Sequence, residues 1–70
     1  PVHFAGRAVN MDAILEVANR HGIPVIEDAA HALETRYKGR RIGETGGATS
    51  CLSFYVTKNI TTVEGGMVLT

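Results

Sequence analysis

The sequence lacks the features that mark several classes of small protein. It has one cysteine, Cys51, so no disulfide can form within the chain, and this cysteine usage is typical of a reducing, cytoplasmic setting. No segment approaches the roughly 20 apolar residues of a membrane span, and no basic and then apolar start indicates a signal peptide. Acidic and basic residues number 7 each, and a chain with zero net charge lacks the excess of basic residues that is typical of nucleic-acid-binding proteins. We therefore expect a cytoplasmic protein with neither a membrane nor a nucleic acid as its partner.

The composition nevertheless resembles the interior of a large globular protein. Apolar residues make up 44% of the 70 residues and charged residues only 20%, whereas a disordered chain would be poorer in aliphatic residues. A free-standing domain of this size normally needs disulfides or a metal cluster, and the three histidines share no spacing typical of a zinc site. The chain also begins at Pro1 rather than at a methionine. We expect it to be a piece of a longer chain, with Cys51 as a small buried hydrophobe rather than a reactive thiol.

The first half of the chain predicts a helix followed by a buried strand. Apolar residues recur at helical spacing over 11–21, Asn10 is a good N-cap, and Asp12 lies in the first turn, where the helix dipole favours an acid. Gly22 is placed to end the helix in the left-handed conformation. Residues 23–26 then read as a short apolar strand that ends at the acidic pair after it. A helix followed so closely by an apolar strand is typical of a β-α-β unit in a parallel sheet.

The second half predicts a hairpin, a loop and two more strands. Residues 35–43 resemble a small hairpin with a turn near 38–40, and the glycine-rich segment 43–50 reads as a loop. Residues 51–56 and 65–70 read as further apolar strands. Strands this apolar need cover on both faces, which one helix cannot supply, so the predicted α/β fold requires a larger molecule.

Polar residues that could carry chemistry follow the predicted strands. Asp28 comes directly after the first strand, His31 lies three residues further on, Ser53 is near the end of the second strand, and Lys58 follows it. In open α/β sheets ligands bind at the carboxyl ends of the strands. A pyridoxal phosphate site needs a lysine for the Schiff base, an acid for the pyridine nitrogen and donors for the phosphate. Each residue also has a simpler interpretation: Asp28 as a helix N-cap, Lys58 as a solvated loop residue, and His31 as a partly buried structural histidine.

The whole chain resembles the pyridoxal phosphate-dependent sugar-nucleotide aminotransferases of the DegT/DnrJ/StrS type. The runs that carry the resemblance are "PVHFAGRAVNMDAI", "HGIPVIEDAAHALETRYKGRRIG", "SFYVTKN" and "EGGMVLT". The pair "EDAAH" and "SFYVTKN" is the specific part. By this resemblance Asp28 matches the acid that binds the pyridine nitrogen, and His31 matches the Gln or His beside the ring. Ser53 likewise matches a residue that holds the cofactor phosphate, and Lys58 matches the Schiff-base lysine.

The resemblance also implies a fold and an activity. It implies a mostly parallel sheet of the aspartate aminotransferase-like, type I fold, with residues 1–70 as a central fragment of one large domain that has no internal boundary. The full enzyme would move an amino group from an amino acid, expected to be glutamate, to a nucleotide-linked keto-sugar, and would build its sites across a homodimer. Because Lys58 is not a histidine, the resemblance favours amino transfer over the family's sugar dehydratases. That dehydratase activity and a non-catalytic truncated relative are the alternatives, and Val63 departs from the glycine of many relatives.

Overall fold

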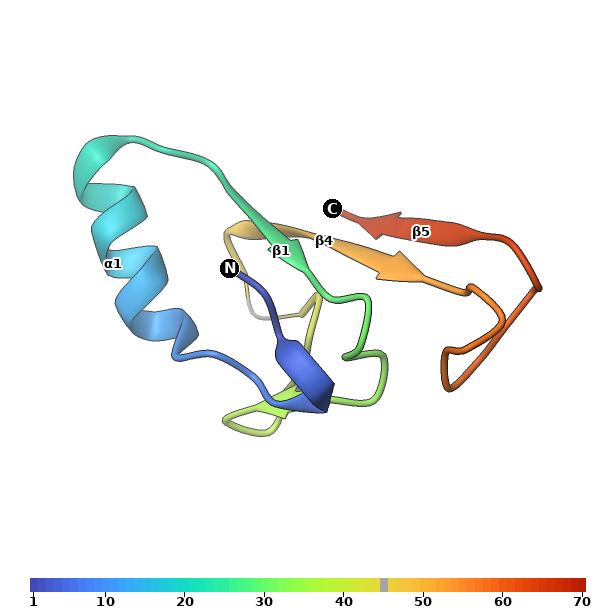
Figure 1. The fold of residues 1–70 in the computed structure, drawn as a ribbon. Helices are drawn as coiled ribbons and strands as arrows, with labels where there is room; N and C mark the ends of the chain where they lie inside the picture. The colour runs from blue at the N-terminus through green and yellow to red at the C-terminus, as the bar shows by residue number, and fades with distance from the viewer. Residues whose placement is uncertain (45) are drawn as a thin grey trace.

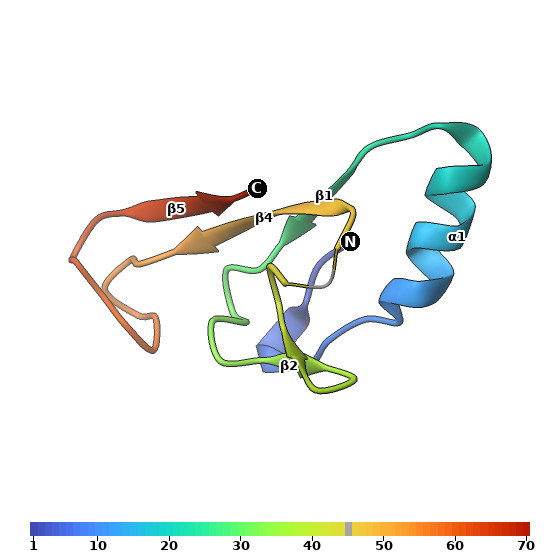
Figure 2. The same cartoon turned by 180° about the vertical axis from the view of Figure 1, so that it is seen from behind.

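The computed structural model describes residues 1–44 and 46–70, and its fold is a small mixed sheet with one helix beside it. Figures 1 and 2 show α1 at one side of the sheet and the connection between β4 and β5 at the opposite end. The elements in chain order are the 3-10 turn η1 (Phe4–Gly6), α1 (Met11–His21), β1 (Val25–Asp28), β2 (Arg36–Tyr37), β3 (Arg40–Arg41), β4 (Ala48–Ser53) and β5 (Gly66–Leu69).

The helix α1 has the bounds that the sequence predicts. The Asn10 side chain accepts a hydrogen bond from the backbone N–H of Ala13, with 3.2 Å between Oδ1 and N, which satisfies one of the unpaired donors of the first turn. Gly22 ends the helix at φ 63° and donates its N–H to the carbonyls of Ala18 and Asn19. The left-handed conformation is one that glycine adopts without a steric penalty. Both predicted caps are therefore confirmed.

The three-stranded sheet has the order β1-β4-β5 and is mixed rather than mostly parallel. Strands β1 and β4 are parallel, whereas β4 and β5 are antiparallel. The difference has a simple cause: the chain between β4 and β5 turns straight back, while a parallel pair needs a crossover connection. An isolated parallel bridge between Val2 and Asp28 pairs the N-terminal segment with the other edge of β1.

Two predicted strands are displaced along the chain. Strand β1 runs over Val25–Asp28 instead of 23–26, so the acidic pair lies inside the strand and does not end it. Strand β4 runs over Ala48–Ser53 instead of 51–56 and thus begins within the predicted loop 43–50. The pairing with β1 sets this start, because Val25 lies opposite Ala48. Residue 45 of the predicted loop lies outside the described residues.

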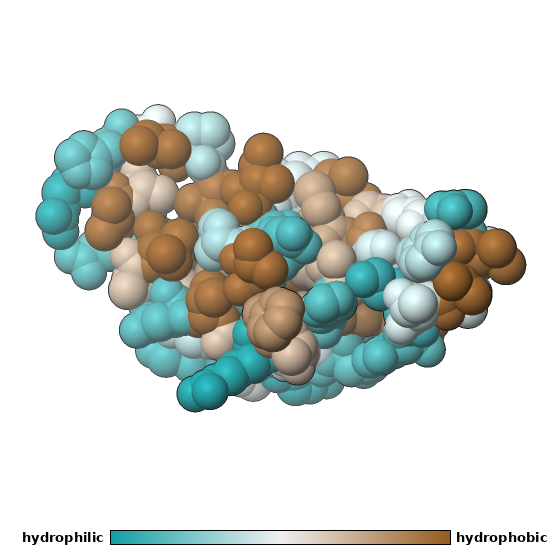
Figure 3. Space-filling model, in the orientation of Figure 1, coloured by the Kyte–Doolittle hydropathy of each residue, from teal (hydrophilic) through white to brown (hydrophobic). Residues whose placement is uncertain are grey.

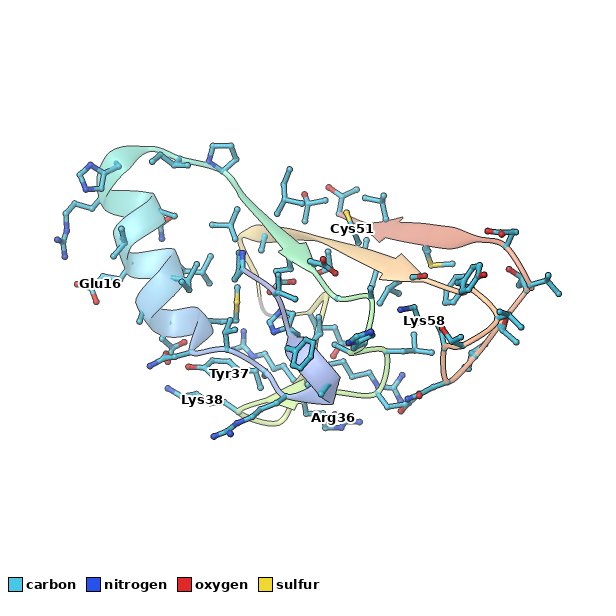
Figure 4. The ribbon with its side chains drawn as sticks, in the orientation of Figure 1. Glu16, Arg36, Tyr37, Lys38, Cys51 and Lys58 are labelled. Atoms are coloured by element: carbon cyan, nitrogen blue, oxygen red, sulfur yellow. The ribbon has the colours of Figure 1, made fainter. Side chains whose placement is uncertain are left out.

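The predicted hairpin forms and is attached to the start of α1. The Tyr37 hydroxyl donates a hydrogen bond to Asn10 Oδ1 at 2.8 Å, and Lys38 forms an ion pair with Asp12. Figure 4 shows Tyr37 and Lys38 beside the first turn of the helix. Because Asn10 caps the helix and also accepts from Tyr37, one side chain holds both elements together.

The apolar core lies on one face of the sheet, and the other face is open. Met11, Ala18 and Val25 form one buried cluster between α1 and β1, and Ala29, Ala32 and Ile42 form a second. The large apolar side chains that are at least half exposed are Val2, Phe4, Val17, Ile23, Ile26, Val56, Ile60, Val63, Met67 and Val68.

Figure 3 shows apolar surface gathered over the helix and the middle of the molecule. Exposed apolar surface of this extent is typical of a face that another part of a protein covers. None of the described helices is long and apolar enough to cross a membrane.

Candidate active site

A pocket of about 300 Å³ lies between η1, the turn after β1 and the loop after β4, and three of the predicted site residues line it. These are His31, Ser53 and Lys58, which come from three different segments of the chain. Ala5 and Gly6 of η1 form part of the wall. The volume is at the lower end of the range of small-molecule sites.

Lys58 reaches the pocket from a loop, because β4 ends at Ser53. Its backbone N–H donates to the Tyr55 carbonyl at 2.9 Å, which closes a tight turn. Lys58 follows the strand, as predicted, but it lies five residues after the strand end rather than the two that the predicted strand 51–56 implies. The Lys58 side chain is half-buried, and its amine forms neither a hydrogen bond nor an ion pair with the part of the chain that the structure describes. Figure 4 shows the side chain on the inner side of this loop.

Hydrogen bonds inside the loop hold the turn that carries Lys58. The Thr62 backbone N–H and the Thr61 hydroxyl both donate to the Phe54 carbonyl, each at 2.9 Å. The Thr61 hydroxyl oxygen also accepts from the backbone N–H of Val63 at 2.9 Å. Val63 has a φ of 70°, a conformation that is unfavourable for a β-branched residue.

His31 is tied to the opposite wall of the pocket. Its Nδ1 accepts a hydrogen bond from the backbone N–H of Ala5 at 3.4 Å, and its ring lies 5.7 Å from that of Phe4 at a tilt of 55°. The Thr35 hydroxyl donates to the Gly6 carbonyl at 2.7 Å, on the same turn. The position of η1 against the pocket is thus fixed by contacts with residues far away in the sequence.

Ser53 and Asp28 lie at the carboxyl ends of the two parallel strands. Ser53 is half-buried in the pocket wall, and its hydroxyl oxygen accepts from the Tyr55 backbone N–H at 3.4 Å. Asp28 is exposed, pairs in register with Cys51, and does not line the pocket. Its Oδ1 accepts from the Ala30 N–H at 3.1 Å, so the carboxylate caps the turn leading to His31 rather than a helix.

The residues present fit a pyridoxal phosphate site in their chemistry. The pocket combines the amine of Lys58, the hydroxyl of Ser53 and the imidazole of His31, and the Asp28 carboxylate lies at the neighbouring strand end. An amine can bind an aldehyde, a hydroxyl can donate to a phosphate, and a carboxylate can hold a proton on a ring nitrogen. In the described residues there is no group of three or more His, Cys, Asp or Glu side chains arranged to hold a metal ion.

Sequence reasoning missed two parts of this region. The first is the η1 wall, whose Ala5 has a left-handed φ of 51° that nothing in the local sequence indicates. The second is a fully buried polar cluster of His3, Glu27 and Ser50. The burial of Glu27 could have been predicted from the sequence, because Glu27 lies two residues after the apolar Val25 and therefore on the same face of the strand.

The comparisons with known proteins agree over the whole chain. The sequence model of the DegT/DnrJ/EryC1/StrS aminotransferase family matches residues 1–70. The chain is 60% identical over 70 residues to the spore coat polysaccharide biosynthesis protein SpsC of Bacillus subtilis (strain 168), covering 100% of this chain and 18% of SpsC. The chain thus spans less than a fifth of that relative's length.

Solved structures show the same arrangement. DesV of S. venezuelae, in complex with a ketimine intermediate, has a TM-score of 0.93 and 48% identity over 100% of this chain and 19% of DesV. Spr1654 of Streptococcus pneumoniae in its PLP form has a TM-score of 0.89 and 30% identity over 99% of this chain and 21% of the Spr1654 chain. The mixed sheet, the helix and the loop described above are therefore shared with the corresponding segments of these proteins.

Proposed function

Because the chain belongs to the DegT/DnrJ/EryC1/StrS aminotransferase family, we propose that it is part of a pyridoxal phosphate-dependent sugar aminotransferase. The reaction moves an amino group from an amino acid, glutamate, to a nucleotide-linked keto-sugar. The observation that carries the proposal is that Lys58, Ser53 and His31 surround one pocket although they come from different segments. In this proposal residues 1–70 are a central part of one large domain, and the enzyme is a cytoplasmic homodimer.

Each polar group has a task that follows from its chemistry and its place. When bound, pyridoxal phosphate supplies an aldehyde that reacts with amines and a ring that accepts electrons from the substrate carbon. Lys58 Nζ would bind this aldehyde and would be released as a free amine when the amine of the amino donor takes its place; the free Nζ would then carry a proton to and from the substrate carbon as general base and acid. The Asp28 carboxylate would hold a proton on the pyridine nitrogen, Ser53 Oγ would donate to the phosphate, and His31 would lie beside the ring.

A broader hollow beside the pocket supports the choice of a phosphorylated substrate. It has a volume of about 660 Å³ and shares His31 and Asn59 with the pocket. The cations Arg7, Arg36 and Lys38 line it, together with the one carboxylate of Glu34. Guanidinium groups are well suited to phosphate oxygens, so a nucleotide diphosphate in this hollow would leave its sugar close to Lys58.

Reductive trapping in the full-length gene product tests the lysine directly. Sodium borohydride in the presence of pyridoxal phosphate should attach a pyridoxyl group to Lys58, which peptide mass mapping would locate. Lys38, the other lysine of this chain, is the internal control, because it is exposed on the hairpin and paired with Asp12.

Substitution gives the second arm of the same test. Lys58→Ala should abolish amino transfer from glutamate to a nucleotide-linked keto-sugar, while Arg20→Ala, at an exposed position of α1 paired with Glu16, retains it. If Lys58→Ala kept a rate of transfer within about tenfold of the parent rate, the assignment would be contradicted, because loss of the nucleophile lowers the rate by much more than this.

A further inference from the structure

A fully buried cluster of three polar side chains lies beneath the strand ends that lead to the pocket. His3, Glu27 and Ser50 each have 0% exposure. The Ser50 hydroxyl donates a hydrogen bond to Glu27 Oε2, and His3 Nε2 lies 3.5 Å from Glu27 Oε1. The three residues come from the N-terminal segment, β1 and β4. A buried carboxylate is costly unless donors surround it, so this cluster requires an explanation.

The hydrogen bonds fix which nitrogen of His3 carries the proton. Its Nδ1 accepts from the backbone N–H of Val9 at 3.2 Å and therefore cannot itself be protonated. We assign the proton of the neutral ring to Nε2, which faces Glu27. The Glu27 carboxylate thus has a hydroxyl donor on one oxygen. His3 Nε2 lies 3.5 Å from the other oxygen in an electrostatic contact, and this buried nitrogen has no hydrogen-bond partner in the described part of the chain.

The cluster connects directly to the segments that form the candidate site. The bond from Val9 to His3 closes the segment 3–9, which contains the η1 wall of the pocket. The backbone N–H of His3 also donates to the Asp28 carbonyl at 3.0 Å, and the Asp28 N–H donates to Pro1 at 2.9 Å. The backbone of Asp28 is therefore fixed to the N-terminal segment by two hydrogen bonds.

The same carboxylate also fixes the two parallel strands. Glu27 pairs in register with Ser50, and their side chains are joined across β1 and β4. Asp28 is the next residue of β1, and Ser53 lies three residues beyond Ser50 in β4. A shift of one strand against the other would thus separate the two groups that we assign to the ring nitrogen and the phosphate.

We propose that Glu27 is a positioning residue for the cofactor site: it holds the N-terminal segment, β1 and β4 together, so that Asp28, Ser53 and the η1 wall keep one relative placement. This inference rests on the proposed function. It adds a residue that touches neither cofactor nor substrate and acts through its neighbours. Groups that orient the residues in direct contact with a ligand typically set how firmly that ligand is held.

The substitution Glu27→Gln tests the proposal with little change in volume. Glutamine has one acceptor and one NH₂ donor, so when its oxygen accepts from Ser50 its NH₂ faces the N–H of His3, donor against donor. His3 cannot change its tautomer in response without losing the bond from Val9. In the full-length gene product we expect the Kd for pyridoxal phosphate to rise about tenfold, since the buried contact between His3 and Glu27 is replaced by two facing donors. The visible circular dichroism per bound cofactor should fall, because that signal reports a fixed orientation.

Two further variants keep the result interpretable. Ser50→Ala removes one donor and keeps the carboxylate, so it should raise the Kd for pyridoxal phosphate by a smaller factor, about threefold. If Glu27→Gln does not fold, the result for Ser50→Ala decides whether the cluster positions the cofactor site. Glu16→Gln is the matched control, because Glu16 is exposed and paired with Arg20 at 2.9 Å. Figure 4 shows Glu16 on the outer side of α1, far from Lys58. This control should keep the parent Kd and dichroism.

The possible outcomes separate the two proposals. If the folded Glu27→Gln and Ser50→Ala proteins keep the parent Kd and dichroism, the positioning role is wrong, even where their melting temperatures fall. If the parent protein itself does not bind pyridoxal phosphate, the proposed function is wrong and this inference fails with it. A raised Kd with reduced dichroism in both variants, beside an unchanged Glu16→Gln, supports the role.

Discussion

The backbone N–H of Phe54 donates a hydrogen bond to the carbonyl of Gly65, with 2.8 Å between nitrogen and oxygen. This bond closes the loop 55–64 at its base and continues the antiparallel ladder in which Ser53 pairs with Gly66. Gly66 is required there, because a Cβ would lie 2.9 Å from the Leu52 carbonyl oxygen. The place of Lys58 therefore depends on the closure of a loop and not on the rigidity of a strand.

Asp28→Asn should separate the turn-capping role of this residue from its proposed role at the ring nitrogen. An asparagine can still accept the Ala30 N–H through Oδ1, so the melting temperature of the cofactor-free protein should stay close to that of the parent. The anionic partner of the pyridine nitrogen would be lost, and we expect the Kd for pyridoxal phosphate to rise about ten- to a hundredfold. Absorbance titration and thermal melts of the full-length product measure both quantities. Parent-like cofactor binding would show that Asp28 is a turn cap alone.

Val63→Gly should stabilise the protein. Val63 has a φ of 70°, and a left-handed conformation costs about 1–2 kcal/mol for a residue with a Cβ, part of which the extra chain entropy of glycine offsets. We expect the free energy of unfolding in urea to rise by about 0.5–1 kcal/mol.

Gly22→Ala is the reciprocal control for this prediction. Gly22 has a φ of 63°, and an added Cβ would meet no atom within 4 Å. The alanine would thus lower the free energy of unfolding by about 1 kcal/mol, through its unfavourable backbone conformation alone. A Val63→Gly protein less stable than the parent would show that the valine side chain contributes more than its strained backbone costs.

The ion pair of Asp12 and Lys38 should make the docking of the hairpin pH-dependent. The hydrogen bond from Lys38, together with its charge, lowers the pKa of Asp12 below 3.8, and Asp12 raises the pKa of Lys38 above 10.5. The stabilisation by the pair is therefore present between these values. It is lost as the pH falls below about 4 through the lowered pKa, or rises through the raised one.

Thermal melts of the parent and of Asp12→Asn check this prediction. The parent should melt slightly higher near neutral pH, and the difference should vanish in acid. Because both side chains are exposed, about 1 M salt should also remove it. A difference that persists in acid would assign the effect of Asp12 to something other than its charge.

An isolated chain of these 70 residues should not act as an aminotransferase. Ile26 and Val68, which are 64% and 60% exposed, lie on an uncovered face of the sheet, and the edge strands present unpaired backbone groups. Too little apolar surface is buried to offset the ordering entropy. We expect aggregation in analytical ultracentrifugation and no cooperative melting transition. A monomeric, cooperatively folding peptide active on a keto-sugar would contradict this.

The local elements follow from short stretches of the sequence. The bounds of α1 follow from Asn10, Gly22 and the apolar spacing between them, because caps and helical periodicity act over a few residues. The hairpin turn at Lys38 and Gly39 is local in the same sense. The family resemblance, and with it the choice of Asp28, His31, Ser53 and Lys58, was also carried by short runs of residues.

How these elements meet depends on contacts between residues that are distant in the chain. The start of β4 depends on its pairing with β1, and the antiparallel direction of β5 depends on how the chain returns after Phe54. The burial of Glu27 depends on His3 and Ser50, which are 24 and 23 residues away in the sequence. The spacing of two residues from Val25 places Glu27 on the buried face of the strand, but it does not identify His3 and Ser50 as its partners, because each of them taken alone is an ordinary polar residue.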